Sequence, residues 1–261
     1  MDLDGRVALI TGAGSGIGRA AALLLARDGV RIGALGRTEE ELEEVVEEIG
    51  RAGGEAITLL ADIARPQEVE AAMATLMERW ERLDVVFANA GVNGVWAPIE
   101  ELEPEEWEQT ISINLSGTFY TIKYAVPHLK KRGGSVIVNS SVNGTRVFSN
   151  TGATAYASSK AAQVALTKML ALELAGAGIR VNVICPGAIE TSIEENTEQR
   201  SLEGVGVAVR FPEGWHPLRN RPGSSEDVAH LVHFLASDAS RHITGTEIWI
   251  DGAESLIGIR G

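Results

Sequence analysis

Short apolar segments alternate with segments of helical periodicity along almost the whole chain, and this alternation restricts the possible folds more than any other feature. The apolar segments consist mainly of Val, Ile, Leu and Ala. Strands that are apolar on both sides must be buried on both sides, as in a parallel sheet covered by helices. The expected strands are 7–10, 31–35, 56–60, 84–88, 135–139, 180–184 and 247–250, and the expected helices are 17–27, 39–51, 66–80, 104–131, 155–174 and 226–235.

Because connections between parallel strands are right-handed, this order predicts a Rossmann-type α/β fold. We expect a doubly wound, mainly parallel seven-stranded sheet with helices on both faces. No linker-like segment or repeat interrupts residues 1–261, so we expect a single domain. One long stretch, about 187–224, breaks the alternation after the carboxyl end of a strand. Loops this long are usually functional lids or disordered segments, and because open α/β sheets bind ligands at that edge, we expect a substrate lid.

Composition and charge exclude several classes of function. The 261 residues are 44% hydrophobic, enough for a sizeable core, yet no apolar run is long enough to cross a membrane. A formal net charge of −13 argues against nucleic acid or an anionic membrane surface as the main partner. The single cysteine, Cys185, fits a reducing compartment, and the N-terminus shows no secretory signal. We therefore expect a cytoplasmic protein. His230 and His233 share a helix face without a supporting cluster, so no metal site is expected.

A glycine-rich turn, Thr11-Gly12-Ala13-Gly14-Ser15-Gly16-Ile17-Gly18, joins the first expected strand to the first expected helix. Glycines there allow the backbone to turn tightly and to approach a pyrophosphate, which then lies on the helix N-terminus. The spacing departs from the common Gly-x-Gly-x-x-Gly pattern, because Ile17 stands at the last required position. A plain tight turn is the alternative. The position at the first strand–helix junction favours dinucleotide binding.

The end of the second expected strand, followed by Arg37-Thr38, bears on which dinucleotide binds. A carboxylate at this strand end would bind both ribose hydroxyls of NAD, and none stands there. Arg37 can pair with the 2′-phosphate of NADP, although a solvated arginine or an ion pair with the acidic helix that follows is the alternative. Thr38 and Glu41 have capping-box spacing, which predicts a helix N-terminus beside Arg37. The charges favour NADP(H) over NAD(H).

Tyr156 and Lys160 begin an expected helix one turn apart, so their side chains share a face. A tyrosine, with an ordinary pKa of about 10, is a poor acid or base at neutral pH. A nearby ammonium lowers that pKa and makes proton exchange with an alcohol or carbonyl oxygen feasible. Ser141 follows another strand end and can bond the same oxygen. The Tyr-x-x-x-Lys pattern alone is common, but its combination with the glycine turn and this serine indicates redox chemistry.

Together these motifs resemble the short-chain dehydrogenase/reductase family, in its branch of compact single-domain subunits. The resemblance covers essentially the whole chain, and residues 11–18 follow that family's own glycine motif, which accounts for the unusual spacing. It also places Asp62-Ile63 at the adenine and Asn89-Ala90-Gly91 along the cofactor. The cofactor-binding residues that it implies are Gly12, Ser15, Gly16, Ile17, Gly18, Arg37, Asp62, Ile63, Asn89, Ala90, Gly91, Tyr156, Lys160, Pro186, Gly187, Ile189 and Thr191.

The resemblance also implies a catalytic set of Asn114, Ser141, Tyr156 and Lys160. In this scheme Tyr156 exchanges a proton with the substrate oxygen and Ser141 polarises that oxygen. Lys160 holds the nicotinamide ribose and lowers the pKa of Tyr156, and Asn114 binds a water that links Lys160 to solvent. Two features depart from the family pattern. The interval from Ser141 to Tyr156 is longer than usual, which implies a loop insertion beside the substrate. Ser15 is neutral where some NADP-using relatives are basic.

The sequence leaves several alternatives open. The expected reaction is hydride transfer between NADP(H) and a small carbonyl or secondary alcohol, and the alternative is an NAD-linked alcohol or polyol dehydrogenase. Enoyl reduction is disfavoured by the short tyrosine–lysine gap, and a non-catalytic dinucleotide-binding protein by the intact catalytic set. A 3-oxoacyl thioester, a sugar or polyol and a secondary alcohol are all candidate substrates. The resemblance implies a homotetramer. Some residues are candidates for the substrate pocket, although each can instead be an ordinary surface-loop or turn residue. They are Trp96, Asn143, Phe148, Asn150, Trp215 and His216.

Overall fold

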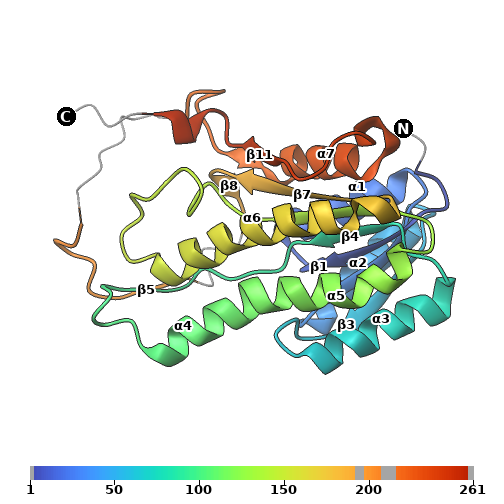
Figure 1. The fold of residues 1–261 in the computed structure, drawn as a ribbon, viewed down its shortest axis with the longest axis horizontal. Coiled ribbons are helices and arrows are strands. Elements are labelled where there is room, and N and C mark those ends of the chain that lie inside the picture. The colour runs from blue at the N-terminus through green and yellow to red at the C-terminus, as the bar shows by residue number, and fades with distance from the viewer. Residues whose placement is uncertain (1–2, 192–196, 207–215, 258–261) are drawn as a thin grey trace.

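A seven-stranded, wholly parallel sheet forms the centre of the computed structural model, which describes residues 3–191, 197–206 and 216–257 (Figure 1). Every strand expected from the sequence is present in it. The strands are β1 (Val7–Thr11), β2 (Arg31–Gly36), β3 (Ala56–Leu60), β4 (Val85–Ala88), β6 (Gly134–Asn139), β7 (Ile179–Pro186) and β11 (Glu247–Ile250). Their order, β11-β7-β6-β4-β1-β2-β3, reverses direction between β1 and β4. Ligands of doubly wound folds bind at this switch point, outside the carboxyl ends of the strands.

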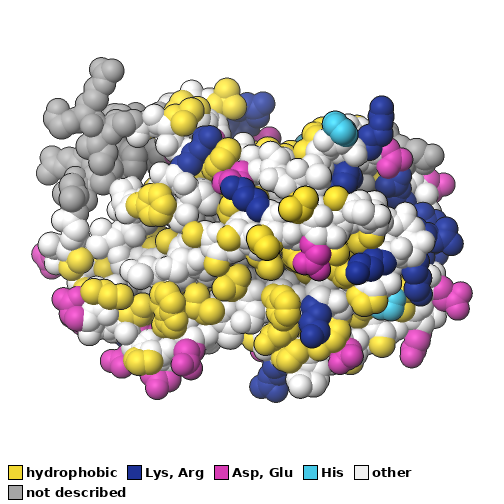
Figure 2. Space-filling model, viewed as in Figure 1, with side chains coloured by type: hydrophobic (Ala, Val, Ile, Leu, Met, Phe, Trp, Pro, Cys, Tyr) yellow, Lys and Arg dark blue, Asp and Glu magenta, His cyan; other side chains and the backbone are white. Residues whose placement is uncertain are grey.

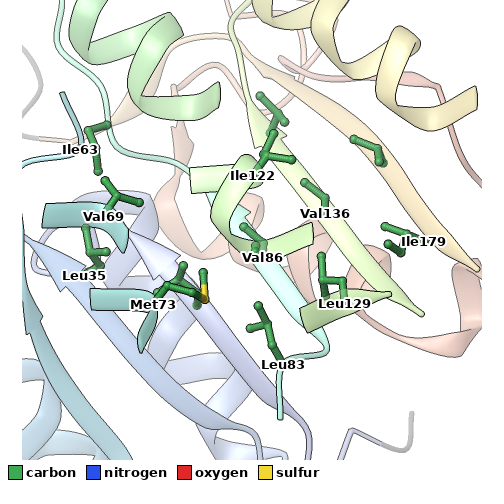
Figure 3. Packing of buried hydrophobic residues seen from close by; sticks show 14 of the residues in the cluster. Leu35, Ile63, Val69, Met73, Leu83, Val86, Ile122, Leu129, Val136 and Ile179 are labelled. Atoms are coloured by element: carbon green, nitrogen blue, oxygen red, sulfur yellow. The ribbon is translucent and has the colours of Figure 1, made fainter. Parts of the chain in front are cut away.

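Helices cover both faces of the sheet. On one face, α1 (Gly16–Arg27), α2 (Glu39–Arg51) and α7 (Ser225–Ala236) enclose one core cluster; on the other, α3 (Pro66–Trp80), α5 (Gly117–Leu129) and α6 (Thr154–Leu174) enclose a second. Neighbouring strand residues alternate between the clusters, as Val86 and Phe87 do. Figure 3 shows Ile122 and Leu129 of α5 beside Val86 and Val136 of the sheet. Burial of each such side chain contributes roughly 1.5–3 kcal/mol.

The segment expected as one long helix over 104–131 is interrupted by a wider turn. It begins as α4 (Pro104–Ile111), continues as a π-helical turn, η1 (Ser112–Ser116), and resumes as α5. The Asn114 carbonyl oxygen in this turn accepts hydrogen bonds from the Thr118 hydroxyl and from the Gln163 amide of α6, each at 2.7 Å. Side chains therefore hold the widened turn. Such single π turns occur mostly at functional sites.

Two small parallel pairs of strands lie outside the main sheet. β5 (Gly94–Trp96) pairs with β9 (Thr197–Gln199), and β8 (Ile189–Glu190) pairs with β10 (Gly223–Ser224). Figure 1 shows β5 at the end of the molecule where α4 lies. Three of these strands fall within the stretch expected to form a lid. Residues 192–196 and 207–215 of that stretch lie outside the described residues. No helix in the described ranges is long and apolar enough to cross a membrane.

Candidate active site

A groove of about 1840 Å³ runs along the carboxyl ends of the central strands. Ligand pockets usually measure roughly 300–1,000 Å³, so this groove has room for a dinucleotide and a second molecule. Nearly all the site residues predicted from the sequence line it. They are Gly12, Ser15, Gly16, Ile17, Arg37, Asp62, Ile63, Asn89, Ala90, Gly91, Ser141, Tyr156, Lys160, Pro186, Gly187, Ile189 and Thr191. Gly18 and Asn114 are not among the lining residues, and each lies behind the groove wall.

The glycine turn after β1 has no room for side chains at two positions. Gly12 has a φ of +65°, and a Cβ there would lie 3.0 Å from the Ala90 Cα. A Cβ on Gly18 would lie only 1.9 Å from the Gly12 carbonyl oxygen, so Gly18 supports the turn from behind. Across the groove, Gly16 faces Thr191, whose methyl group would be 3.4 Å from an added Cβ. The turn leads into α1. Its backbone therefore leaves open the space that a pyrophosphate needs when it binds at a helix N-terminus.

Asn89 fixes the position of this turn relative to β4. The Thr11 hydroxyl accepts hydrogen bonds from the backbone amides of Asn89 (3.0 Å) and Ala90 (3.1 Å). The Asn89 side-chain amide donates to the Thr11 carbonyl oxygen at 3.0 Å and accepts from the Asn139 amide at 2.8 Å. Three strand ends, β1, β4 and β6, are thereby joined through one asparagine. The floor of the groove is consequently tied together by hydrogen bonds.

The far end of the groove, beyond the glycine turn, is lined by Arg37, Thr38 and Glu41. Arg37 is exposed and forms no ion pair within the described residues, so the expected alternative of an ion pair with α2 is not seen. α2 begins at Glu39, as expected, but the capping box predicted for Thr38 and Glu41 is not formed. The Glu41 side chain turns instead toward Gly14, where its carboxylate would lie 2.8 Å from an added Cβ. The first backbone amides of α2, next to the lining residue Thr38, therefore have no side-chain cap.

Asp62 and Ile63 line the same end of the groove after β3. The Asp62 carboxylate accepts from the backbone amide of Ala64 at 2.9 Å, and the Asp62 backbone amide donates to Glu68 at 2.8 Å. Ile63 is buried at 5% exposure. These bonds hold the turn before α3, so the position of Asp62 at the groove is set by local hydrogen bonding.

Ser141, Tyr156 and Lys160 meet at the other end of the groove. All three are buried, at 7%, 7% and 3% exposure. Tyr156 is hydrogen-bonded to the Ser141 side chain. The Lys160 ammonium donates to the Asn139 carbonyl oxygen at 2.8 Å and lies 5.5 Å from the centre of the Tyr156 ring. The end of β6 and the first turns of α6 therefore place a hydroxyl pair and an ammonium side by side.

The pKa values of this cluster differ in part from the sequence-based prediction. Burial raises the pKa of Tyr156 above its ordinary value, with the Ser141 hydrogen bond opposing the shift, whereas the sequence predicted a lowered value. Burial also lowers the pKa of Lys160 to about 8. The prediction was wrong in sign because it counted the attraction of the ammonium but not the desolvation of both groups. Without a ligand, Tyr156 is a protonated acid at neutral pH.

Asn114 lies beneath the cluster and is fully buried. Its amide oxygen accepts from the Val92 backbone amide, and its amide nitrogen donates to the Val92 carbonyl oxygen, both at 2.9 Å. The same nitrogen donates to the Ser159 hydroxyl at 3.1 Å, and Ser159 donates to the Tyr156 carbonyl oxygen at 2.6 Å. Asn114 thus connects the segment after β4 to the start of α6. A Cβ on Gly91 would lie 3.1 Å from its amide oxygen and 3.5 Å from the Lys160 nitrogen.

Comparison with known proteins agrees with this arrangement. A family profile described as enoyl-(acyl carrier protein) reductase, of the short-chain alcohol dehydrogenase type, matches residues 12–253. The 3-oxoacyl-[acyl-carrier-protein] reductase of Thermotoga maritima is 37% identical over 253 residues, which cover 97% of this chain and 98% of that protein. The chain is a short-chain dehydrogenase/reductase. A cyclohexanol dehydrogenase of an Acinetobacter species is 38% identical over 96% of this chain and 95% of its own length.

Solved structures of other members of the family match the fold over nearly its whole length. A 3-ketoacyl-ACP reductase from Sinorhizobium meliloti is 54% identical, with a TM-score of 0.92, over 96% of this chain and 99% of that one. A 3-ketoacyl-(acyl-carrier-protein) reductase from Brucella melitensis, complexed with NADH, is 29% identical with a TM-score of 0.85, over 97% and 99% of the two chains. This short-chain dehydrogenase/reductase is thus an oxidoreductase that acts on carbonyl or alcohol groups with a nicotinamide dinucleotide.

One wall of the groove in this oxidoreductase was not predicted from the sequence. β5 and β9 form it, and the Asn93 side-chain amide donates to the Thr197 hydroxyl at 2.7 Å. Arg200, just after β9, donates to both carboxylate oxygens of Glu106 in α4, at 2.8 and 2.9 Å. This anchor fastens the described part of the expected lid to the body. Strands of three residues, paired across a hundred positions, leave no recognisable pattern in the sequence.

The weaker sequence candidates divide into two groups. Trp96, Asn143, Phe148 and Asn150 line the groove, whereas Trp215 lies outside the described residues. His216 is paired with Glu254 at 3.6 Å. Within the described ranges, no three or more His, Cys, Asp or Glu side chains gather closely enough to hold a metal ion. Burial raises the pKa of the Cys185 thiol to about 11, which suits a core residue better than a nucleophile.

Proposed function

We propose that the enzyme transfers a hydride between NADP(H) and the carbonyl or secondary alcohol group of a small organic substrate, with Tyr156 as the acid and base. The observation that carries this proposal is the buried Ser141–Tyr156 pair beside Lys160, in the same groove as the glycine turn. A protonated tyrosine paired with a hydroxyl is suited to an uncharged carbonyl oxygen. The tyrosine and lysine stand one helical turn apart, as in the carbonyl-reducing members that the sequence resembles.

The chain's own residues supply proton transfer and positioning. The nicotinamide, when bound, supplies the hydride in reduction and accepts it in oxidation. In reduction, Tyr156 gives its phenolic proton to the carbonyl oxygen as the carbon gains the hydride, so carbonyl and NADPH plus one proton become alcohol and NADP⁺. Ser141 donates a hydrogen bond that polarises the same oxygen. Lys160 holds the nicotinamide ribose and, through its charge, favours the phenolate that remains.

Asn114 takes a positioning role in this proposal. Its side chain is satisfied by Val92 and Ser159, so it holds Gly91 and Val92 in place beside Lys160. Its carbonyl oxygen already accepts from Thr118 and Gln163. The resemblance implies a water bound to Asn114; at this carbonyl oxygen such a water would have to share the oxygen with Thr118 and Gln163 or displace one of them. We therefore assign Asn114 to the support of the Lys160 site.

The choice of NADP(H) rests on the far end of the groove. Arg37 is a cation without an ion-pair partner within the described residues, and the uncapped start of α2 adds backbone amides and a positive helix-dipole end. A 2′-phosphate bound there would be stabilised by the Arg37 charge, by hydrogen bonds from these amides and by the helix dipole. The Glu41 carboxylate beside Gly14 opposes them, and the related reductase complexed with NADH fits the alternative that NAD(H) binds as well. Two more glutamates, Glu39 and Glu40, stand in the first turn of α2 but do not line the groove, so we give Arg37, which does line it, the greater weight.

Fluorescence titration with NADPH and NADH tests the cofactor assignment directly. Wild-type protein should bind NADPH more tightly than NADH, and Arg37→Ala should remove most of that margin while leaving NADH affinity unchanged. Arg132→Ala, another arginine that does not line the groove, is the matched control. Equal or tighter binding of NADH by wild-type protein would refute the NADP assignment and make an NAD-linked alcohol dehydrogenase the working hypothesis.

Turnover of a panel of carbonyl compounds and an enoyl thioester tests the reaction. We expect Tyr156→Phe to reduce carbonyl turnover by about 10²–10⁴-fold, the usual size of a lost acid–base contribution. NADPH affinity should stay within twofold, since the phenol ring remains. Carbonyl turnover that survives in this variant would refute the proton-donor assignment. Reduction of the enoyl thioester alone would favour enoyl chemistry instead.

We also propose that copies of the chain pair through the face formed by α4, α5 and α6. Figure 2 shows hydrophobic side chains gathering on this face. They include Phe119 of α5, at 45% exposure, and Met169 and Leu172 of α6, at 72% and 85%. Large exposed apolar patches mark interaction surfaces. A homotetramer, as the resemblance implies, would bury them, and light scattering that shows a monomer would overturn this proposal.

A further inference from the structure

The substrate end of the groove has a composition that points to a particular class of substrate. We define this end by two walls: the loop of residues 141–152, and the β5–β9 pair with Asn93. Side-chain amides concentrate here. Asn93, Asn143, Asn150 and Gln199, called the amide group below, all line the groove. An amide carries both a donor and an acceptor, as a hydroxyl does, so it is suited to bind hydroxyl groups of a ligand.

The first wall connects the amide group to the reacting atoms. The Asn143 backbone amide donates to the Ser141 hydroxyl oxygen at 3.1 Å, and the Asn150 side-chain amide donates to the Asn143 side-chain oxygen at 2.8 Å. This bond leaves the Asn143 side-chain nitrogen and the Asn150 oxygen without partners within the described residues. The two unused groups are a donor and an acceptor, placed next to the serine that bonds the substrate oxygen. A second hydroxyl close to the reacting carbon would satisfy both.

The second wall consists of the β5–β9 pair and Asn93. The Asn93 amide donates to the Thr197 hydroxyl, and β9 places Gln199 beside Trp96. The walls meet where the Ala97 backbone amide donates to the Gly152 carbonyl oxygen at 3.3 Å. Trp96 and Phe148 add aromatic surface, one from each wall. Aromatic rings pack against the C–H face of a ligand while amides bond its hydroxyls. Polar and apolar contacts are thus both available over a short distance.

The charged residues at this end are engaged in internal contacts. The Arg146 guanidinium lies 3.6 Å from the centre of the Trp249 ring. Glu254 accepts from the Ala188 backbone amide at 3.2 Å and pairs with His216. Lys160 is directed at the Asn139 carbonyl oxygen. Two cations line this end: Lys160, which is buried and bonds the Asn139 carbonyl oxygen, and Arg146, which is exposed and lies against Trp249 on the loop of residues 141–152. The groups hydrogen-bonded in sequence from Ser141 are nevertheless neutral amides, Asn143 and Asn150, which suit a neutral substrate near its reacting carbon.

We infer that the enzyme acts on neutral polyhydroxylated compounds, that is, a polyol or sugar and the carbonyl compound formed from it. This inference deepens the proposed function and rests on it. One secondary hydroxyl, or the carbonyl derived from it, bonds Tyr156 and Ser141. A neighbouring hydroxyl is bound by Asn143 and Asn150. The reaction stays balanced as before: the alcohol carbon loses a hydride to NADP⁺, and the hydroxyl proton passes to Tyr156.

A comparison of substrates tests the inference. Oxidation with NADP⁺ is measured for neutral polyols and aldoses of four to six carbons and for cyclohexanol, which has the secondary alcohol but no second hydroxyl. Reduction with NADPH is measured for an acetoacetyl thioester. The expected result is a kcat/KM for the best polyol or aldose at least tenfold above that for cyclohexanol. Equal values, or turnover of the thioester alone, would overturn the inference while the proposed function stands. No turnover of any of them would overturn both.

Two variants link the preference to the amide group. In Asn143→Leu and Asn150→Leu, the ratio of polyol to cyclohexanol kcat/KM should fall about tenfold, because one hydrogen bond to the substrate is lost in each. The Asn143 backbone amide still reaches Ser141 in the variant. Gln67→Leu, an exposed amide on α3, is the matched control and should leave the ratio unchanged. A ratio that stays constant in both asparagine variants would show that the amides do not bind substrate.

Discussion

The two ends of the groove are built by different means. At the cofactor end, backbone shapes the surface: the glycine turn follows β1, and added atoms at Gly12 or Gly18 would meet other backbone atoms. At the substrate end, side chains and three-residue strands form the walls, and Arg200 anchors one of them to α4. Where backbone atoms lie this close, only glycine fits the position, whereas a wall formed by side chains accepts substitution by other residues. The substrate end can therefore change specificity while cofactor binding is preserved.

The largest expected effect that separates the two ends is that of Gly18→Ala. Its Cβ would meet the Gly12 carbonyl oxygen, so the turn must shift, and overpacking of this kind costs roughly 1–3 kcal/mol. The free energy of unfolding and the NADPH affinity should both fall. Gly50→Ala, in α2 with open space around it, should instead raise stability by about 0.5–1 kcal/mol. Urea unfolding and NADPH titration measure both, and unchanged NADPH binding in Gly18→Ala would contradict a backbone-shaped cofactor end.

The pH dependence of reduction tests the junction between the two ends, where Lys160 lies. Its pKa of about 8 means that its charge is present below pH 8 and is lost above it. Tyr156, with its pKa raised, keeps its proton over the same range. Reductive kcat/KM should therefore be flat near pH 7 and fall up to tenfold per pH unit well above pH 8. In Lys160→Arg the guanidinium stays charged, so the decline should vanish below pH 10. A decline that persists there would assign it to another group.

A smaller effect, confined to the substrate end of the groove, is expected from Arg200→Gln. Loss of the paired bonds to Glu106 loosens the β9 wall, so KM for the substrate should rise about three- to tenfold. The NADPH dissociation constant should not change, because Arg200 does not line the groove and bonds to Glu106 of α4 instead. Arg6→Gln, which removes an ion pair with Asp238, serves as the control. A change in NADPH affinity in Arg200→Gln would show that the two ends are not independent.

The smallest effect is expected from Glu41→Gln. Removing the carboxylate beside Gly14 should tighten NADPH binding about two- to threefold, since a partly exposed charge contributes less than about 1 kcal/mol. NADH, which lacks the 2′-phosphate, should bind within error of wild type. Glu40→Gln lies in the same turn of α2 but does not line the groove, so it should have no effect. The difference should shrink at high salt, because exposed charges are screened. Equal tightening of NADH would contradict a repulsion directed at the 2′-phosphate.

The amino-acid sequence by itself determined the order of strands and helices and the parts of the groove that depend on backbone. Strands that are apolar on both faces must be buried, and right-handed crossovers allow few orders of such strands in a sheet. The parallel sheet therefore followed from the sequence pattern. The glycine turn and the strand-end positions of Asn89 and Ser141 followed with it. These features are local, and each is confined to a few consecutive residues.

Only the tertiary structure decided the features that depend on distant residues. Burial reversed the expected pKa shift of Tyr156, since desolvation is a property of everything packed around the phenol. Glu41 turned toward Gly14 rather than capping α2, and Gln163 of α6 holds the widened turn at Asn114. The β5–β9 wall joins segments a hundred residues apart. Such contacts form because the fold has brought their partners together, and the short segments that make them carry no pattern of their own.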